Sequence, residues 1–433
     1  MTPKFTLPVL FLFLVSLPLI PRALQANDIW RGGSVYSHYA LGLPHDYRAP
    51  YADAMGVLGV AVHDNWLPSV ANPALWSRAI LTNASGAFEI HSYEASHRDV
   101  QASYTQFRAG PFQMVLPVKR DRIGIAFSVT PLTSSRFITE SETVLSVDEN
   151  HTGEELLYAF QSTGNGGMNR FEAGVGVRIT DNLSAGYAPS LLLGVIRRDQ
   201  IIMFDNLDYR PVNLRESTSH YGFGNRFGLY YSTRNFFRET DRFSLGAVVS
   251  MPVNLVSSRS LKSRVDFQDV ILRSEAEYGT GSVTYPAEGA LGFSYSYNPF
   301  VMITGDVLFQ NWENYTNFNG DPEGFLKNRW RAGLGGQYMA GRKGGSRFFS
   351  YFLYRMGVSY DTGSLRFSDN QIETLSLHAG IGIPSSRTNS SIDINAEYGF
   401  RGTSSDGLIS ERIFAVKIAF NLSEIMFIQR RHQ

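Results

Sequence analysis

Residues 413–422 read IFAVKIAFNL and alternate between large apolar side chains and smaller or polar ones. The large apolar residues occupy every second position: Phe414, Val416, Ile418, Phe420 and Leu422. Lys417 and Asn421 fall between them. A period of two places these two sets on opposite faces of a β-strand. The stretch therefore predicts a strand with one apolar face.

Similar alternation recurs from about residue 87 to the end of the chain, as in SLGAVVSM (244–251) and LSAGYAPSLLLGV (183–195). The candidate strands lie near 87–94, 107–117, 122–130, 171–180, 183–196, 221–232, 242–252, 286–297, 300–311, 329–340, 348–360, 374–383, 391–400 and 412–422. They number about 14, an even count, as in single-chain bacterial outer-membrane barrels. The sequence thus predicts an all-β fold, a transmembrane antiparallel β-barrel of about 14 strands.

The predicted connections alternate in length along the chain. Short or modest connections fall at 119–121, 180–182, 298–299, 341–347 and 385–390. Long polar segments separate them, at 131–170, 197–220, 253–285 and 312–328. Outer-membrane barrels have short periplasmic turns and longer extracellular loops. We therefore expect the short connections at one end of the barrel and the long segments, as loops, at the other.

The composition supports a membrane protein of this kind. The chain has 433 residues, a formal net charge of zero, 18% charged residues and no cysteine. Soluble proteins average about 25% charged residues. The neutral balance argues against a nucleic-acid partner, and the absence of cysteine excludes disulfides and thiolate metal sites. Aromatic residues make up 13% of the chain and cluster towards the predicted strand ends, where barrels have interfacial girdles.

The N-terminus has the pattern of a secretory signal peptide over residues 1–26, with a positive start, an apolar run and small residues before a cleavage point after Ala26. The competing interpretation is a retained membrane helix. Residues 27–86 are apolar but do not alternate, and we predict that they form a hatch, or plug, inside the barrel. The barrel itself is expected over 87–422, followed by a short periplasmic tail at 423–433.

One motif within the predicted hatch indicates how it is held. The stretch VANPALW (70–76) combines the Asn72-Pro73 step, which favours a turn, with the apolar residues Ala74, Leu75 and Trp76. We predict that this turn fixes the hatch to the inner wall just before the first strand.

The chain resembles the FadL/TodX family of outer-membrane transporters for long-chain fatty acids and other hydrophobic compounds. The similar stretches cover most of the predicted mature chain: ADAMGVLGVAVHDNWLPSVANPAL (52–75), GPFQMVLPVKRDRIGIAFSV (110–129), MNRFEAGVGVRITDNLSAGYAPSLLLGVIRR (168–198), WRAGLGGQYM (330–339), MGVSYDTG (356–363) and LSLHAGIGI (375–383). The resemblance implies 14 strands, a hatch that blocks the lumen, and a kink in the third strand that opens a lateral exit to the membrane.

The resemblance also suggests two sets of site residues. Thr130 and Pro131 end the third predicted strand and are candidates for the lateral opening, although Pro131 could simply terminate the strand. Arg197 and Arg198 are candidates for binding a fatty-acid carboxylate, since guanidinium groups match carboxylates. Their alternative role is a solvated loop pair or a contact to anionic lipid head groups.

No catalytic motif or metal-ligand spacing is present in the sequence, and we expect no enzyme activity, metal or cofactor. The predicted function is passive passage of hydrophobic compounds, such as long-chain fatty acids, across the outer membrane of a Gram-negative bacterium. The expected partners are the hydrophobic molecule and outer-membrane lipid, without nucleic acid. The alternative is a barrel of the same fold that binds a protein partner as a secretion accessory.

Overall fold

The computed structural model of the chain describes residues 32–46, 48–63, 69–98, 100–147, 154–205, 211–265, 268–270, 279–339, 341, 348–367, 369–385 and 388–424. The predicted signal peptide at 1–26 and most of the predicted C-terminal tail at 423–433 lie outside these residues.

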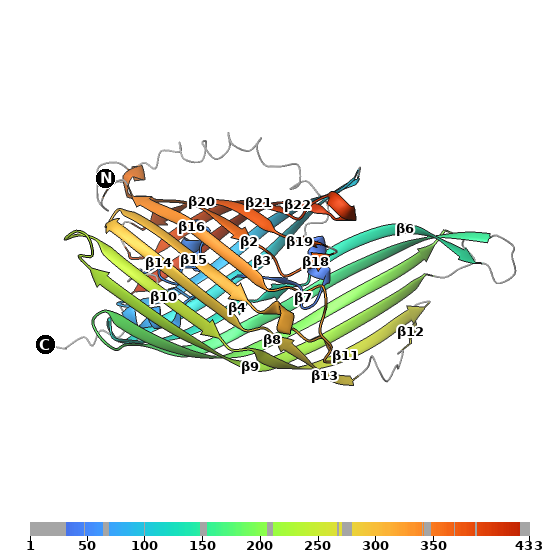
Figure 1. Ribbon diagram of the computed structural model, residues 1–433, viewed down its shortest axis with the longest axis horizontal. Coiled ribbons are helices and arrows are strands. Elements are labelled where there is room, and N and C mark those ends of the chain that lie inside the picture. Colours follow the sequence, from blue (N-terminus) through green and yellow to red (C-terminus); the bar gives the residue numbers. More distant parts are fainter. Residues whose placement is uncertain are drawn as a thin grey trace, which may run out of the picture.

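Fourteen antiparallel strands form a closed ring (Figure 1). In order around the ring they are β2 (Thr82–His97), β3 (Val100–Lys119), β4 (Ile123–Pro131), β7 (Glu154–Arg178), β8 (Leu183–Phe204), β9 (Val212–Arg234), β10 (Arg242–Ser250), β14 (Glu288–Asn298), β15 (Val301–Gln310), β16 (Arg329–Met339), β17 (Leu353–Asp361), β20 (Thr374–Pro384), β21 (Ser391–Arg401) and β22 (Ser410–Glu424). β22 pairs with β2 and closes the ring. The predicted fold class and strand number are confirmed.

Three wall strands continue beyond a break. The continuing pieces are β6 (Phe137–Val147) after β4, β11 (Val253–Val265) after β10, and β13 (Gly279–Tyr285) before β14. A proline lies at each break: Pro131, Pro252 and Pro286. Proline has no N–H to give to the ladder, so a strand is interrupted there at low cost.

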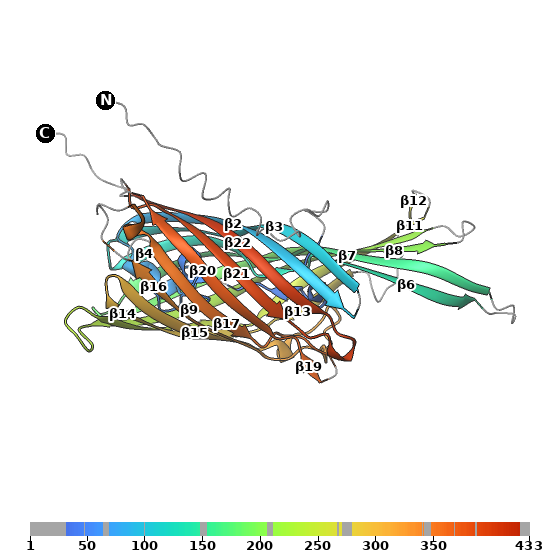
Figure 2. The ribbon, with the colours of Figure 1, turned by 90° about the horizontal axis from the view of Figure 1, so that it is seen from above.

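The strands on one side of the barrel run well past the rim of the other side (Figure 2). β8 and β9 have 22 and 23 residues, whereas β15 and β17 have 10 and 9. The segments 131–170, 197–220 and 253–285, predicted as long loops, are therefore wrong as loops, because much of their length is strand. These segments lack a sustained alternation of apolar and polar residues, so a search for that alternation misses their strands.

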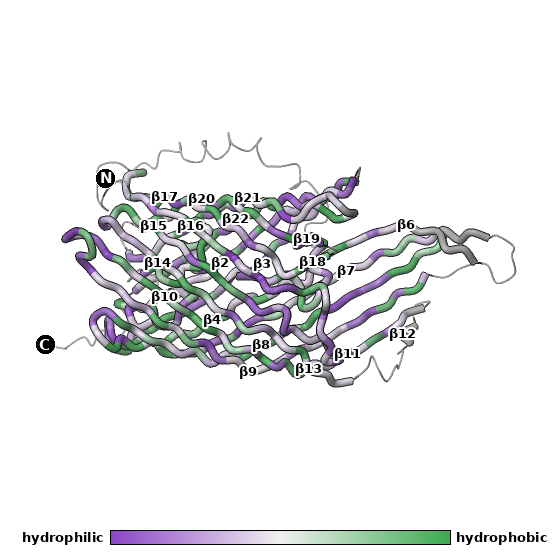
Figure 3. The backbone as a smooth tube through the Cα atoms, in the orientation of Figure 1, coloured by the Kyte–Doolittle hydropathy of each residue, from purple (hydrophilic) through white to green (hydrophobic). Residues whose placement is uncertain are grey.

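The two faces of the wall differ as the alternation predicts. Phe420 and Leu422 on β22 are 45% and 61% exposed on the outer face, while Lys417 and Asn421 are buried inside. Figure 3 shows hydrophobic and hydrophilic residues alternating along the wall strands. An outer apolar face on a closed barrel is that of a membrane-spanning protein of the outer-membrane type. Helices add no membrane crossing in the described part of the chain, since none has the necessary length and apolar composition.

The remaining elements are short. Near the N-terminus lie η3 (Val35–His38), β1 (Leu43–Pro44), α2 (Pro50–Asp53) and η4 (Pro73–Arg78). In the connections lie β5 (Thr133–Ser134), β12 (Gln268–Val270), η5 (Trp312–Asn314), η6 (Phe348–Tyr351), β18 (Arg366–Phe367), β19 (Asn370–Gln371) and η7 (Ser405–Gly407).

The described residues from 32 to 81, here called the N-terminal segment, lie inside the ring of strands. Hydrogen bonds join them to strands on several sides, including β9, β15, β16 and β21. β2 begins at Thr82, before the expected boundary at 87.

Glycines on the inner wall let this segment approach closely. A Cβ on Gly186 of β8 would lie 2.3 Å from the carbonyl carbon of Pro73 and 2.4 Å from the amide nitrogen of Ala74. Gly228 of β9 meets Asn72 in the same way, at 2.2 Å from its Oδ1. The atoms opposite Gly186 belong to the backbone and cannot move away as a flexible side chain can, while the Asn72 amide opposite Gly228 is held by its hydrogen bonds, so the wall must lack a side chain at both points.

The substitution Gly186→Ala should therefore destabilise the folded barrel by about 1–3 kcal/mol, the usual cost of forcing an extra group into a packed interior. Thermal unfolding in detergent would show a lower midpoint. Gly289→Ala on β14 is the matched control, because nothing lies within 4 Å of a Cβ there. Equal midpoints for the two variants would contradict the close packing of the N-terminal segment against β8.

Candidate functional site

The Asn-Pro turn joins the N-terminal segment to the wall. Asn72 is the N-cap of η4, and its Oδ1 accepts a hydrogen bond from the Ala74 N–H at 2.9 Å. Its Nδ2 donates to the carbonyl oxygens of Val60 and Leu229, both at 2.9 Å. One amide side chain thus caps the turn, ties two parts of the segment together and bonds to β9.

The apolar residues after the proline complete this junction. Ala74, Leu75 and Trp76 are buried, and the indole N–H of Trp76 donates to the Ser69 carbonyl at 3.2 Å. Arg78 at the end of η4 donates from Nε to the Ser184 hydroxyl of β8 at 3.0 Å. All four predicted motif residues, Asn72 to Leu75, therefore lie together at the inner wall.

A carboxylate of the N-terminal segment forms a second junction, with cations of the wall. Asp46 lies 2.8 Å from a guanidinium nitrogen of Arg329 and 2.9 Å from one of Arg331, both on β16. Arg331 also donates to the Gly56 carbonyl at 2.7 Å. The Asp46 side chain is 5% exposed, so these ion pairs are poorly screened by water.

Further ion pairs surround this one. Arg48 of the segment contacts Asp53 at 3.2 Å and Glu397 of β21 at 3.5 Å. On the two strands that follow β21 around the ring, Glu89 of β2 contacts Lys417 of β22 at 3.0 Å. These charged groups line an internal cavity of about 120 Å³, together with the side chains of Asp46, Arg108, Arg329, Arg331 and Arg401. The cavity is polar and has room for a few water molecules.

The protonation of Asp46 follows from this setting. Burial opposes its ionisation, but the guanidinium groups of Arg329, Arg331 and Arg48 outweigh burial and hold the pKa of Asp46 below its usual range. A lowered pKa means that the ionised carboxylate stabilises the folded state at neutral pH. This stabilisation is lost only as the pH falls below the usual range of a carboxyl group.

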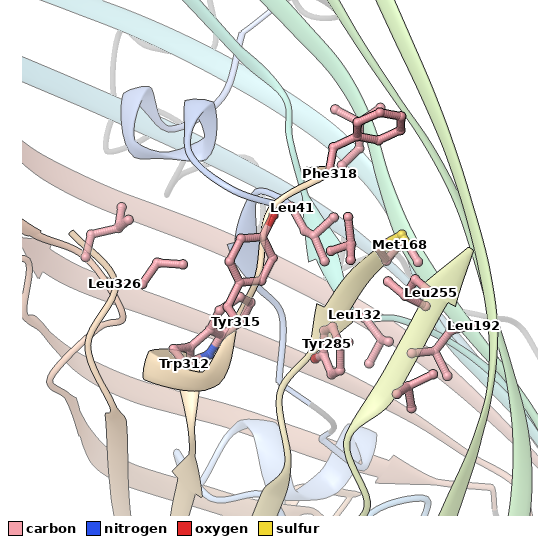
Figure 4. Packing of buried hydrophobic residues seen from close by; sticks show 14 of the residues in the cluster. Leu41, Leu132, Met168, Leu192, Leu255, Tyr285, Trp312, Tyr315, Phe318 and Leu326 are labelled. Carbon is pink, nitrogen blue, oxygen red and sulfur yellow. The ribbon is translucent and has the colours of Figure 1, made fainter. Parts of the chain in front are cut away.

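An apolar cluster lies further along β8, on the side of the turn towards the protruding strands (Figure 4). It joins the N-terminal segment, the wall and the connections. The residues labelled there are Leu41, Leu132, Met168, Leu192, Leu255, Tyr285, Trp312, Tyr315, Phe318 and Leu326. Leu132 follows Pro131, in the chain that turns inward between β4 and β6, so the cluster reaches the break in the third wall strand.

The wall is unpaired at this break. β3 pairs with β4 from Phe112 to Lys119, and its residues 100–109 pair only with β2 among the described residues. β6 pairs only with β7 in the described part of the chain. Among the described residues, the edges of β3 and β6 beyond this break therefore have no strand pairing with each other. We call this gap in pairing the β3–β6 opening.

Thr130 and Pro131 are the last residues of β4 that pair with β7. They therefore lie where the pairing of the wall stops and the β3–β6 opening begins. Beyond them, β5 turns inward and pairs with β1 of the N-terminal segment. Gly167 of β7 accommodates this turn, since a Cβ there would lie 2.2 Å from the Thr133 carbonyl oxygen, while a Cβ on the adjacent Gly166 would lie 1.9 Å from the Val195 carbonyl oxygen of β8. Both have positive φ, at 106° and 148°.

Arg197 and Arg198 are not brought together. Arg197 is exposed on the outer face of β8, while the side chain of Arg198 points inward. Arg198 donates from Nη2 to the carbonyl oxygens of His38 and Ala40, both at 3.0 Å. Adjacent strand residues face opposite ways, so a paired carboxylate clamp from these two side chains does not form.

The sequence analysis missed the charged residues of the lumen. Asp46, Arg329 and Arg331 are distant in sequence, and no local motif joins them. In the sequence, Arg329, Arg331 and Gly333 alternate with Trp330, Ala332 and Leu334. This alternation was the available signal that the arginines face inward. No group of three or more possible metal-ligating side chains is found among the described residues.

A model of one protein family matches residues 11–433, and its description is BamG. The chain belongs to the BamG family. A search of curated protein sequences finds no match.

Solved structures with a similar fold are outer-membrane channels. The Ralstonia pickettii toluene transporter TbuX is 14% identical with a TM-score of 0.55, over 87% of this chain and 98% of that one. A Pseudomonas aeruginosa FadL homologue is 14% identical with a TM-score of 0.55, over 88% and 98%. The CymD monoaromatic hydrocarbon channel is 15% identical with a TM-score of 0.54, over 88% and 98%. The chain thus has the FadL/TodX fold of the outer membrane.

The substitution Asp46→Asn should loosen the N-terminal segment, because it leaves the guanidinium groups of Arg329 and Arg331 short of a buried counter-charge. Removing one partner of a buried ion pair costs about 3–5 kcal/mol. We expect a lower unfolding midpoint at neutral pH and faster proteolysis within residues 32–81.

Asp369→Asn provides the control for this variant, since its fully exposed carboxylate pairs with Arg366 on the surface. If Asp46→Asn and Asp369→Asn were equally stable and equally resistant to protease, the ion pairs of Asp46 would not hold the segment.

Proposed function

We propose that the barrel passes hydrophobic compounds sideways into the outer membrane, through the β3–β6 opening, rather than through its lumen. The observation that carries this proposal is the position of Leu132, which belongs both to the inward-turned chain at the opening and to the apolar cluster. An apolar compound held at this cluster would have a short route to the membrane.

The described part of the lumen is a less favourable route. It contains the buried ion pairs of Asp46 and Arg48, and a compound passing them would have to separate charges that are costly to leave unpaired in the interior. Moving into the membrane instead keeps the compound in an apolar medium, which is worth roughly 0.8 kcal/mol for each CH₂ group. The N-terminal segment therefore acts as the hatch.

The N-terminal segment also lies against the inner side of the opening. A Cβ on Gly33 would lie 2.1 Å from the carbonyl oxygen of Arg136, and one on Gly32 would lie 2.3 Å from Cβ of Tyr104 on β3. Passage through the opening would require these residues to shift. Thr130 and Pro131 would form the foot of the route.

The class of compound is suggested by the similar folds. TbuX is described as a toluene transporter and CymD as a monoaromatic hydrocarbon channel, which supports small hydrocarbons as substrates here. Long-chain fatty acids are a further candidate. Arg198 would then offer its Nε, which is buried and has no hydrogen-bond partner among the described residues, to the carboxylate. Arg197, on the outer face, would contact solvent or lipid head groups.

Outer-membrane lipid is the expected surrounding of the wall. On its outer face, β15 to β22 form an apolar hollow of about 820 Å³, with Ile303, Tyr338, Tyr354, Met356 and Ile381 in its lining. Acyl chains would fill such a hollow in a bilayer.

A protein-binding accessory barrel is the second candidate function. It is favoured by the internal cavity being small and polar, and by the sheet that protrudes beyond the rim (Figure 2). A transporter needs space for its substrate, whereas a barrel that binds a partner can be filled. The two functions differ in whether the purified barrel moves a compound without help.

A reversible cross-link between β3 and the inward-turned β5, beside the β3–β6 opening, tests the lateral route. The Nε2 of Gln106 on β3 lies 3.5 Å from the Ser134 hydroxyl of β5, and the natural chain has no cysteine. With Gln106→Cys and Ser134→Cys joined by a cleavable thiol cross-linker, uptake of toluene or oleate by cells should fall at least tenfold. Cleaving the linker should restore it.

The matched control joins strands that are already paired. Asn83 of β2 donates to the Ser423 hydroxyl of β22 at 2.8 Å, so Asn83→Cys and Ser423→Cys can be linked without closing any gap. This lock should leave uptake unchanged. Uptake that persists with the β3–β5 lock in place would contradict the lateral route.

A further inference from the structure

The protruding sheet has one long unpaired edge, formed by β6. Its 11 residues pair with β7 without a register shift, from Phe137 opposite Gly164 to Val147 opposite Glu154. No described strand pairs with its other edge. At about 3.3 Å per residue, this edge presents roughly 36 Å of backbone.

Edge strands of this length are usually protected. Common devices are proline, a β-bulge, lysine or a covering element. β6 reads FITESETVLSV, with neither proline nor lysine, and its ladder with β7 has no bulge; its only charged residues are Glu140 and Glu142. Besides β7, η3 packs against β6 near its first residue, where the ring of His38 lies 4.7 Å from the ring of Phe137. The described chain therefore leaves the edge open.

The sheet beside this edge carries an apolar face on the side that continues the inner wall. The register places Phe160 of β7 opposite Ile202 of β8, and Ile202 opposite Val212 of β9. Two residues further along, Tyr158 lies opposite Phe204, with ring centroids 6.4 Å apart. These side chains are only half-buried. They lie in a single layer of sheet outside the closed part of the barrel, where no second layer covers them among the described residues.

This apolar face extends towards the open edge. Phe160 is opposite Ser141 of β6, which is small and exposed, so Phe160 is not covered from that side. β9, β8, β7 and β6 pair with one another in that order, and no described strand pairs with the far edge of β6. A further strand next to β6 could satisfy its backbone and, with an apolar residue beside Ser141, cover Phe160.

We propose that β6 is a docking edge for an extended strand of another polypeptide, which adds antiparallel to β6 and places apolar residues over the face of Phe160. A row of unpaired amide and carbonyl groups is complemented by the backbone of an extended chain, as in β-strand addition. The alternate side chains of the added strand would give specificity. Lipid offers no such periodic set of donors and acceptors.

A second copy of this chain fits the edge less well. Two barrels side by side in one membrane point their β6 strands in the same direction, so their edges could meet only in parallel. Every wall pairing in this barrel is antiparallel, and parallel pairing is slightly weaker for each residue. The edge lies at the end away from the short turns 120–122 and 180–182, which is the extracellular end in outer-membrane barrels. The partner strand is therefore expected there.

Amide hydrogen exchange of β6 tests this proposal on the full-length barrel. In an antiparallel strand, successive residues direct their N–H groups to opposite edges. In detergent, one alternate set of β6 amides should exchange fast and the set bonded to β7 slowly. In the native outer membrane the fast set should become at least tenfold slower. In the outer membrane of a heterologous host, which has the lipid but not the partner, it should stay fast.

Two substitutions on β7 provide the matched pair. Phe160→Ser removes an apolar side chain from the proposed docking face and should abolish the slowing in the native membrane. Ala159→Ser changes the adjacent residue on the other face and should preserve it. If Phe160→Ser disturbed the fold instead, the amides bonded to β7 would also exchange faster in detergent, and Tyr158→Ser would then replace it.

Three results would overturn the proposal. The first is an equally fast exchange of the open-edge amides in detergent and in the native membrane. The second is slowing in the heterologous membrane as well, which would indicate lipid or a second copy. The third is an efficient disulfide between two copies of a Ser141→Cys variant in the native membrane, which would identify the occupant as this chain itself. The measurement is independent of uptake, so it can fail while the lateral route stands.

Discussion

The contact between Asp46 and the paired guanidinium groups of Arg329 and Arg331 is the constraint on which the interior depends. A 14-stranded barrel has a lumen wider than its own wall side chains can fill. Here the N-terminal segment fills it, and the segment stays because a buried carboxylate meets two buried cations. The Asn72 amide then bonds the segment to β9, and the inner-wall glycines allow its backbone to lie directly against the wall.

This arrangement separates the barrel interior into regions with different chemistry. Around Asp46 the groups are charged, paired and buried, and they line a small polar cavity. Further along the axis, the cluster of Leu41, Leu132 and Met168 is apolar and meets the break in the wall between β3 and β6. An apolar molecule is favoured in the second region and disfavoured in the first. The same separation suits a barrel whose lumen is closed and whose protruding sheet binds a partner.

The sequence predicted the barrel because its outer face is chemically uniform. In IFAVKIAFNL every second side chain is apolar, and the membrane requires this along most wall strands. It did not predict the protruding strands, since a sequence such as FITESETVLSV in β6 does not alternate regularly between apolar and polar residues. The inner contacts were harder still. Asp46 and Arg329 meet only because the ring closes, and no local pattern records this.

The arginine pair shows how far a strand can extend beyond its apolar pattern. Arg197 and Arg198 were both candidates for binding a carboxylate, and they follow directly on a stretch that alternates with a period of two. Continuing that period to residue 198 would have placed them on opposite faces, as the structure does. The strand simply extends further than the apolar pattern that revealed it.

Conductance in a planar bilayer is the most direct test of the central claim that the lumen is closed and any exchange occurs through the wall. The purified barrel should show no steady ohmic current in salt solution at neutral pH, because the N-terminal segment fills the path along the axis. A stable, porin-like conductance from the intact chain would show an open aqueous lumen and contradict the account.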